Sequence, residues 1–357
     1  EDFREEATET WDSFNHAAFT LPEWHILKEG KLSLVTVNVE LKTGESADLI
    51  REKIRTIFAR LDQVNSLEEY VEADASASEF TIVDELENEE RHWLDRIATA
   101  TRQIRAGLYK KIVLARKLHI KTDRQISDTC LLNKLRQQYP DCYLFLIGFN
   151  DKGSFIGATP ERLATFHRNK IITEGLAGSI SRGKTALEDA YLEHSLLNSD
   201  KDLNEHAIVV DAIEASLNPY STRIEHPAQP GVKKLTNVQH LFTPVTAHIQ
   251  EGVSRTEILK TLHPTPAVGG YPREKAVPYI RQLENFDRGW YAGPIGWINA
   301  AGEGEFAVAI RSGLIKKNEA HFFAGCGIVE HSDPHKEWEE TNLKFIPMLS
   351  ALKYAIQ

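Results

Sequence analysis

The chain has 357 residues, of which 41% are hydrophobic, enough to bury a large core and too many for a disordered chain. Acidic residues outnumber basic ones by 52 to 42, the formal net charge is -10, and no long run of lysine and arginine occurs. Nucleic acid and anionic membrane surfaces are therefore not expected as partners. An acidic ligand would require a few placed cations or a metal ion.

Cysteine content and hydropathy predict a cytoplasmic protein. Cys130, Cys142 and Cys326 are widely spaced without a CxxC pair, so a disulfide framework or a zinc site is not expected. No stretch approaches about 18 uncharged apolar residues, and no membrane span is expected. The first residues lack the basic and apolar regions of a signal peptide, and Glu1 in place of Met indicates a natural N-terminus further upstream.

The first part of the chain has mainly helical patterns. A surface helix is expected over 1–18, a half-buried strand over 32–41, and amphipathic helices over 47–66 and 86–108. We expect residues 1–90 to complete the sheet of a single structural domain, with residues 91–357 forming its catalytic region.

From residue 110 onward, short β-rich segments alternate with grouped helices. Strands are predicted over 110–120, 143–150, 153–160, 162–168, 170–178, 237–249, 289–299, 304–315 and 319–329. Helices are predicted over 185–217 and from Pro334 to about Ala355. Strands in hairpin order favour an α+β fold with large antiparallel sheets, because regular βαβ alternation is missing. No GxGxxG, HExxH or GxSxG motif occurs.

Carboxylates on two predicted helices are candidates for a metal site. In DLNEHAIVVDAIEASL, helical periodicity places Glu205 at the centre of an apolar face, where a carboxylate must be paired, protonated or bound to a metal. In PHKEWEETNLK, Glu337, Glu340 and Lys344 share one face. The alternatives are a salt-bridged core glutamate and an ordinary solvated helix. Together the two helices provide carboxylates suited to magnesium.

Four other residues are candidates for chemistry. Lys111 opens the strand KIVLAR, where it would act as a base if burial disfavours its charge, or protect a strand end. Glu161, after Pro160 in GATPERL, is a general acid or a loop surface group. Arg311 interrupts the strand EFAVAIRSG and meets either a ligand carboxylate or a protein carboxylate. His263, in the proline-rich loop LHPTPAVGGYP, points into a site or is structural.

Ten segments in this order and spacing resemble the chorismate-utilising family, which includes isochorismate, salicylate, anthranilate and aminodeoxychorismate synthases. The resemblance covers roughly residues 98 to 353. The segments are KIVLAR, GATPERL, TEGLAGSISRG, NEHAIVV, VQHLF, LHPTPAVGGYPREKA, FDRGWYAGPIGW, EFAVAIRSG, AGCGIV and DPHKEWEETNLK.

The resemblance implies two large packed antiparallel sheets with outer helices and a substrate cleft between the sheets. It implies Mg²⁺ held by Glu205 and Glu340, with Glu337 and Lys344 lining the same end of the pocket. Tyr291, Arg311 and a turn containing Gly325 and Gly327 would bind the enolpyruvyl carboxylate, and Gly178 would lie against the substrate. His263 and Ala267 would line the same pocket.

Three positions distinguish the branches of this family. Lys111 is typical of members that use water, Ala177 replaces the lysine of aminodeoxychorismate synthases, and Ala267 stands where salicylate- and anthranilate-forming members usually have threonine. The resemblance thus implies an isomerase that makes isochorismate for menaquinone or catechol siderophore synthesis. Lys111 would activate water, Glu161 would protonate the departing hydroxyl, and no obligatory amidotransferase subunit is expected. The alternatives are a salicylate synthase and an anthranilate-synthase-like subunit.

Overall fold

The computed structural model of the chain describes residues 10–12, 14–65, 79–84, 86–149, 152–236 and 238–356. The chain forms two compact units, one of residues 15–75 and the other of residues 1–14 and 76–357. The smaller unit contains the hairpin of β1 (Trp24–Glu29) and β2 (Leu32–Val37) and the helix α1 (Ala47–Asn65). This hairpin is a two-stranded sheet of its own, and among the described residues its strands do not pair with the larger sheets.

The larger unit is built on two seven-stranded sheets whose recorded pairings are all antiparallel. The first has the order β12 (Gly270–Tyr271), β4 (Lys111–Lys121), β16 (Glu319–Ile328), β15 (Ser312–Lys316), β6 (Ser154–Thr159) and β5 (Tyr143–Gly148), with β3 (Thr81–Ile82) on β4. The second has the order β10 (Gly231–Lys234), β11 (Val238–Ile249), β8 (Lys170–Ser181), β7 (Arg162–His167), β14 (Gly304–Val308) and β13 (Pro294–Ile298), with β9 (Ser221–Glu225) on β11. The predicted α+β class is confirmed.

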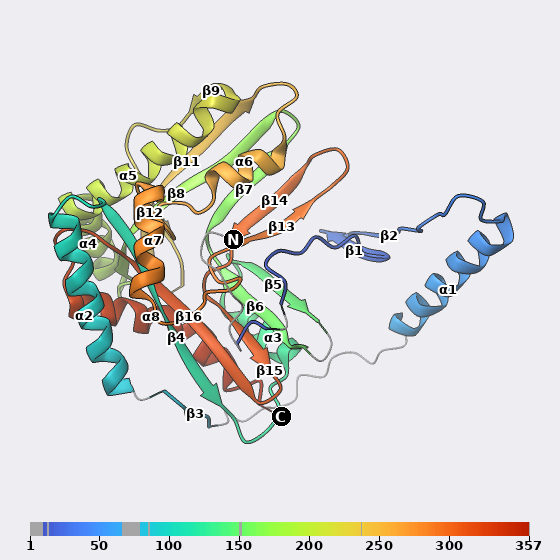
Figure 1. Ribbon diagram of the computed structural model, residues 1–357, viewed down its shortest axis with the longest axis horizontal. Coiled ribbons are helices and arrows are strands. Elements are labelled where there is room, and N and C mark those ends of the chain that lie inside the picture. Colours follow the sequence, from blue (N-terminus) through green and yellow to red (C-terminus); the bar gives the residue numbers. More distant parts are fainter. Residues whose placement is uncertain are drawn as a thin grey trace. The chain divides into compact units, whose positions relative to one another are not determined.

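Helices surround the two sheets (Figure 1). They are α2 (Leu86–Arg105), α3 (Asp128–Gln138), α4 (Ala186–Leu197), α5 (Asp200–Leu217), α6 (Arg255–Leu262), α7 (Arg273–Leu283) and α8 (Pro334–Leu352), with a 3-10 turn at Asn218–Tyr220. Helix α5 packs on β8 and β11, and α8 packs on β16. Phe155 and Phe323 of the first sheet share one buried apolar cluster with Phe166 and Val245 of the second, so the sheets face each other across this core.

Three predictions about secondary structure were wrong or incomplete. The described part of 1–18 has turns and no helix, and Trp11 is fully buried against Phe323 instead of lying at the surface. The strand predicted over 304–315 is two strands in different sheets, because the chain crosses between the sheets at Arg311, whose φ is 51°. Helices α3, α6 and α7 were not predicted.

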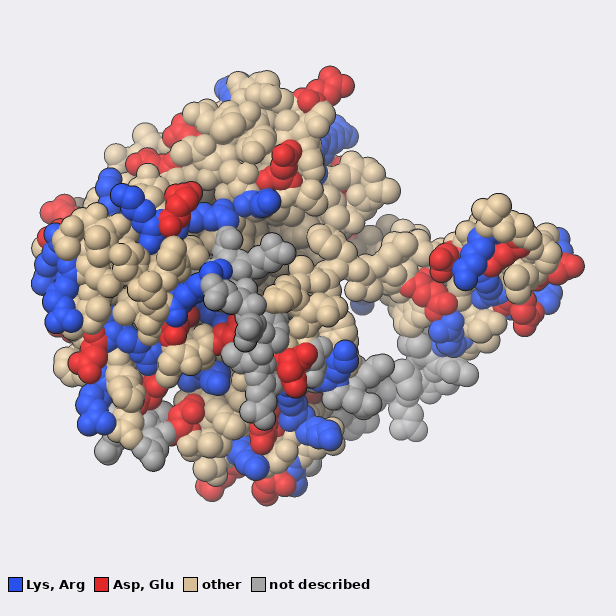
Figure 2. Space-filling model, in the orientation of Figure 1, with Lys and Arg blue, Asp and Glu red and all other residues tan. Residues whose placement is uncertain are grey.

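The described residues contain no helix with the length and apolar character that a membrane span requires. On the face that Figure 2 shows, basic and acidic side chains are interspersed.

Candidate active site

One pocket takes its walls from both large sheets and from α5 and α8. Eleven of the residues predicted for the site line it, which are Lys111, Glu161, Gly178, Glu205, Ala267, Tyr291, Arg311, Gly325, Gly327, Glu340 and Lys344. These residues come from segments that are far apart in the sequence. The fold therefore brings the two helical carboxylates of the predicted metal site into the same pocket as the predicted acid and base.

Lys111 and Glu205 form a buried ion pair in this pocket. Lys111 is only 1% exposed where β4 begins, and its Nζ donates a hydrogen bond to Oε1 of Glu205 at 2.7 Å. Glu205 lies at the edge of the buried face of α5, whose centre is near His206 and Ile213, so its predicted place at the centre of the buried face was wrong. Gly327 leaves room for the pair, because a Cβ there would lie 2.7 Å from the Glu205 oxygen.

Helix α8 adds two further acidic groups and a lysine at this end of the pocket. Nζ of Lys344 donates hydrogen bonds to Oε1 of Glu340 at 2.6 Å and to the carbonyl of Gly325 at 2.9 Å. Burial raises the pKa of Glu340, but the Lys344 ammonium outweighs it, and the net shift is downward. Glu337 was predicted to line the pocket, but it does not. It is buried beside Glu340, with Lys201 at 3.8 Å, and burial followed by the Glu340 charge raises its pKa.

The carboxylates at this end fit a divalent cation of the magnesium type. Lys201 interacts electrostatically with Glu337, Glu205 and Glu340, which places all three negative groups in one neighbourhood. Carboxylate oxygens are the hard donors that magnesium prefers. Each of the three carboxylates lies within 3.8 Å of a lysine ammonium in the structure, and a bound cation would share these negative charges with the lysines.

Glu161 has the environment that a general acid requires. It follows β6 and is 6% exposed. Burial raises its pKa to about 7, with a further contribution from the carboxylate of Glu174. Glu174 is itself held by Nζ of Lys233 at 2.7 Å. Glu161 is therefore protonated in a substantial fraction of molecules near neutral pH, which favours the acid interpretation over a loop surface group.

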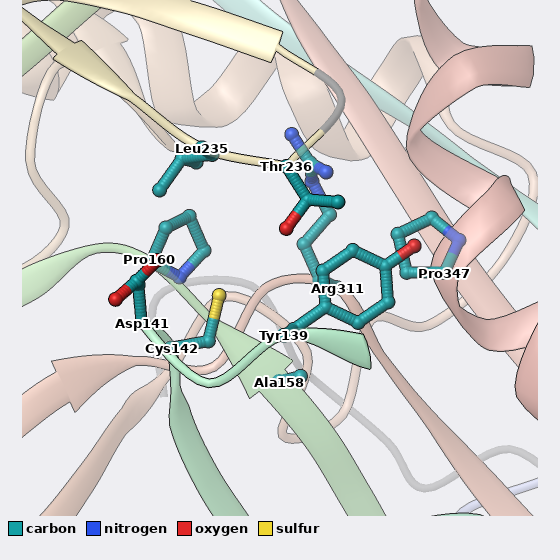
Figure 3. A pocket seen from close by; sticks show the side chains of 9 residues that line it. All are labelled: Tyr139, Asp141, Cys142, Ala158, Pro160, Leu235, Thr236, Arg311 and Pro347. Carbon is teal, nitrogen blue, oxygen red and sulfur yellow. The ribbon is translucent and has the colours of Figure 1, made fainter. Parts of the chain in front are cut away.

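Arg311 is buried without an ion pair to any carboxylate among the described residues, so the alternative of a paired structural arginine is not supported. It lies in the crossover between β14 and β15 and borders both the main pocket and a smaller one with Tyr139, Cys142 and Pro160 (Figure 3). A buried guanidinium of this kind is costly without an anion, and its fork suits a carboxylate. Tyr291 lines the same pocket and stacks on Phe323 with ring centroids 5.2 Å apart.

Two histidines differ from the predictions. His263 does not line the pocket, and its Nε2 bonds the carbonyl oxygen of Ala292 at 2.8 Å, which supports a structural role. His240, in the VQHLF segment, does line it but was not predicted. Its Nδ1 bonds Ser179 Oγ at 2.8 Å, and burial together with Arg311 lowers its pKa to about 3. It is therefore a neutral imidazole near neutral pH.

The expected turn at Gly325 and Gly327 is also different in the structure. Both glycines lie inside β16, paired with Ala115 and Val113 of β4, and a Cβ on Gly325 would lie 3.2 Å from the Tyr291 hydroxyl. Because these two glycines of β16 have no side chains, they leave space in the pocket. Gly178 adopts a φ of 77° in β8, which favours glycine, and lies close to Asp202 of α5.

The sequence and the structure are similar to known proteins along most of the chain. The sequence model of the chorismate binding enzyme family matches residues 2–353. Isochorismate synthase MenF of Bacillus subtilis is 41% identical over 348 residues, 98% of this chain and 72% of that protein. The salicylate biosynthesis isochorismate synthase of Pseudomonas aeruginosa is 39% identical over 349 residues, 96% of this chain and 71% of that protein.

Two solved structures are similar in fold. MenF, the menaquinone-specific isochorismate synthase of Escherichia coli, matches with a TM-score of 0.76 and 27% identity over 85% of this chain and 69% of that one. Anthranilate synthase component I of Streptococcus pneumoniae matches with a TM-score of 0.75 and 26% identity over 91% of this chain and 72% of that one. The family model, which begins at residue 2, also matches the first ninety residues, which the sequence motifs alone did not cover.

Proposed function

Because the chain belongs to the chorismate-binding enzyme family, we propose that it is an isochorismate synthase, an isomerase that converts chorismate into isochorismate. The observation that carries this proposal is the presence of Lys111 and Glu161 in one pocket, the first buried at a strand end and the second with a pKa raised to about 7. A water-using reaction requires a base for water and an acid for the leaving hydroxyl, and these residues provide both.

The reaction that we propose balances without any further reactant. Lys111, once it has lost its own proton, removes a proton from water as the water oxygen bonds to ring carbon 2. The two ring double bonds shift, and the bond between carbon 4 and its hydroxyl breaks. Glu161 donates its proton to that hydroxyl, which leaves as water. One water enters and one leaves, so the product is an isomer of the substrate.

The substrate's carboxylates determine how it is oriented. Arg311, unpaired with any described carboxylate, would bind the enolpyruvyl carboxylate together with the Tyr291 hydroxyl and the backbone of Gly325 and Gly327. Glu205 and Glu340 would hold magnesium, with Glu337 and Lys344 beside them. When bound there, the ion would neutralise the ring carboxylate. It would also interact with Glu205, whose carboxylate is paired with Lys111 in the structure.

Ala267 supports isochorismate as the final product. It lines the pocket without a hydroxyl, at a position where the salicylate- and anthranilate-forming branches usually have threonine. Lys111 likewise supports water over ammonia as the nucleophile, so no amidotransferase partner is proposed.

Product analysis tests this proposal. The purified chain is incubated with chorismate and Mg²⁺, and the products are separated by chromatography. Isochorismate without salicylate or pyruvate is the expected result. Stoichiometric pyruvate with salicylate would reassign the chain to the lyase branch, and anthranilate formed only with ammonia would reassign it to the ammonia-using branch.

A further inference from the structure

Three side chains with metal-binding atoms meet at the end of β4 and β16 opposite to the candidate active site. His119 lies on β4, and Glu319 and His321 lie two residues apart on β16. His321 is directly opposite His119 in the antiparallel register. Since side chains alternate along a strand, Glu319 and His321 project on one face and His119 projects beside them. Eight residues of extended strand, about 26 Å, separate His119 from Lys111.

The donor atoms of this cluster have a spacing that a metal ion can bridge. Nε2 of His119 lies 3.3 Å from Oε2 of Glu319, and one ligand atom from each of the three residues lies within 4.8 Å of the others. Two donors that bind one tetrahedral zinc ion at about 2.0–2.2 Å are themselves about 3.3–3.6 Å apart. The pair of His119 and Glu319 thus already has this separation, and a ligand atom of His321 lies within 4.8 Å of both.

His321 has unused bonding capacity. Its side chain is 8% exposed, and Nδ1 is buried with no hydrogen-bond partner among the residues that the structure describes. Its ring stacks on that of His119 with centroids 4.4 Å apart. A buried polar nitrogen without a partner is costly, and imidazole nitrogens are common metal ligands.

The charged residues around His119, Glu319 and His321 indicate which class of metal ion the cluster would bind. Lys121 approaches Glu319 at 3.8 Å, Lys117 and Lys316 add positive charge near His321, and Lys316 is paired with Asp12 at 3.2 Å. A hard cation held mainly by charge, such as magnesium, is disfavoured by these lysines. Two imidazoles with one carboxylate instead suit zinc and similar transition metals, which form stronger bonds to nitrogen.

We propose that His119, Glu319 and His321 form a binding site for a divalent transition metal ion of the zinc class, separate from the pocket that contains Glu205 and Glu340. The ion would connect β4 to β16, and water would complete its coordination. Because the three ligands converge only in the folded chain, the bound ion stabilises the native state. The site does not depend on the function proposed above.

Zinc titration of the full chain tests this site. The protein is freed of metals with a chelator, dialysed, saturated with Mg²⁺ to occupy the carboxylate pocket, and titrated with Zn²⁺ by calorimetry. Wild type is expected to bind one Zn²⁺ at this site and to melt at a higher temperature with it. His119→Gln and Glu319→Gln should each weaken Zn²⁺ binding by at least about tenfold. Removing a residue that only hydrogen-bonds a metal ligand already weakens metal binding by about this factor. Both residues are partly exposed, so folding should persist, which circular dichroism checks.

A matched control is available on the other sheet. His167 lies 3.2 Å from Glu303, a similar histidine and glutamate pair, and no third ligand joins it among the described residues. His167→Gln should leave zinc affinity and the zinc-induced rise in melting temperature unchanged. The proposal is overturned if wild type binds no Zn²⁺ beside saturating Mg²⁺, or if folded His119→Gln and Glu319→Gln bind it as wild type does.

Discussion

Nζ of Lys111 lies 2.7 Å from Oε1 of Glu205, so the proposed base is hydrogen-bonded to a proposed metal ligand. The two residues come from a strand and a helix that are 94 positions apart in the sequence. This contact couples the two halves of the proposed chemistry, because any change that moves Glu205 also moves the ammonium group of Lys111. The contact also explains why β16 has a glycine, Gly327, beside Lys111 and Glu205, since a side chain there would collide with them.

Gly327→Ala should therefore reduce activity without unfolding the chain. The new Cβ would lie 2.7 Å from the Glu205 oxygen and 2.8 Å from Cε of Lys111, both flexible side-chain ends that can shift. Displacing a base by about 1 Å can cost roughly 100-fold in rate, and we expect a loss of that order in kcat. Steady-state kinetics measures it. Gly231→Ala is the matched control, since a Cβ there would meet only the Phe242 carbonyl oxygen, at 4.0 Å, and equal kinetics of the two variants would contradict the prediction.

Magnesium should be required, and the requirement should trace to Glu205 and Glu340. Glu340→Gln removes one negative charge from the proposed metal site and one partner of Lys344. We expect a sharp loss of activity and a higher Mg²⁺ concentration for half-maximal rate, measured by titrating Mg²⁺ in the assay. Full activity of wild type in excess EDTA would end the metal hypothesis.

The pH dependence should reflect Glu161. As the general acid it must be protonated, and its pKa is raised to about 7, so kcat/KM should fall as pH increases through about 7. Glu174→Gln removes a negative charge that raises this pKa and leaves Lys233 without its carboxylate partner, and both changes favour ionised Glu161. The basic limb of the profile should therefore move to lower pH in this variant. A limb that moves upward, or stays in place, would show that Glu161 does not control it.

Arg311→Lys should impair substrate binding although the charge is retained. A single ammonium cannot reproduce the bidentate contact of a guanidinium with a carboxylate. We expect an increase in KM for chorismate, with or without a lower kcat. An unchanged KM in initial-rate measurements would mean that Arg311 supports the crossover between the sheets and does not bind substrate.

Local periodicity predicted part of the site, whereas Gly178, Ala267 and Tyr291 were expected only from the resemblance to the chorismate-utilising family. Glu340 and Lys344 are one turn apart on α8, and Lys111 opens a strand whose pattern is plain in the sequence. The fold class followed from hairpin-ordered strands. The actual side of α5 that is buried was not predictable from apolar spacing alone, because His206 is also buried there, with its Nε2 bonded to Thr243 Oγ1 at 2.8 Å.

Other features depend on contacts that no local pattern contains. The crossover at Arg311 requires a positive φ in a non-glycine residue, whereas the apolar run around it is typical of one continuous strand. His240 is a single histidine in a buried strand, and only its contact with Ser179 across the β8–β11 pairing places it in the pocket. The buried position of Trp11 likewise depends on Phe323, which is more than three hundred residues away.

The most direct test of the central claim measures the origin of the new oxygen and its dependence on Lys111. Chorismate and Mg²⁺ are incubated with the chain in water labelled with heavy oxygen, and mass spectrometry follows isochorismate over time. The account predicts one heavy oxygen at carbon 2, and a rate at least about 100-fold lower for Lys111→Ala, which should still bind chorismate. Unlabelled isochorismate, or a near-normal rate of labelling by Lys111→Ala, would contradict it.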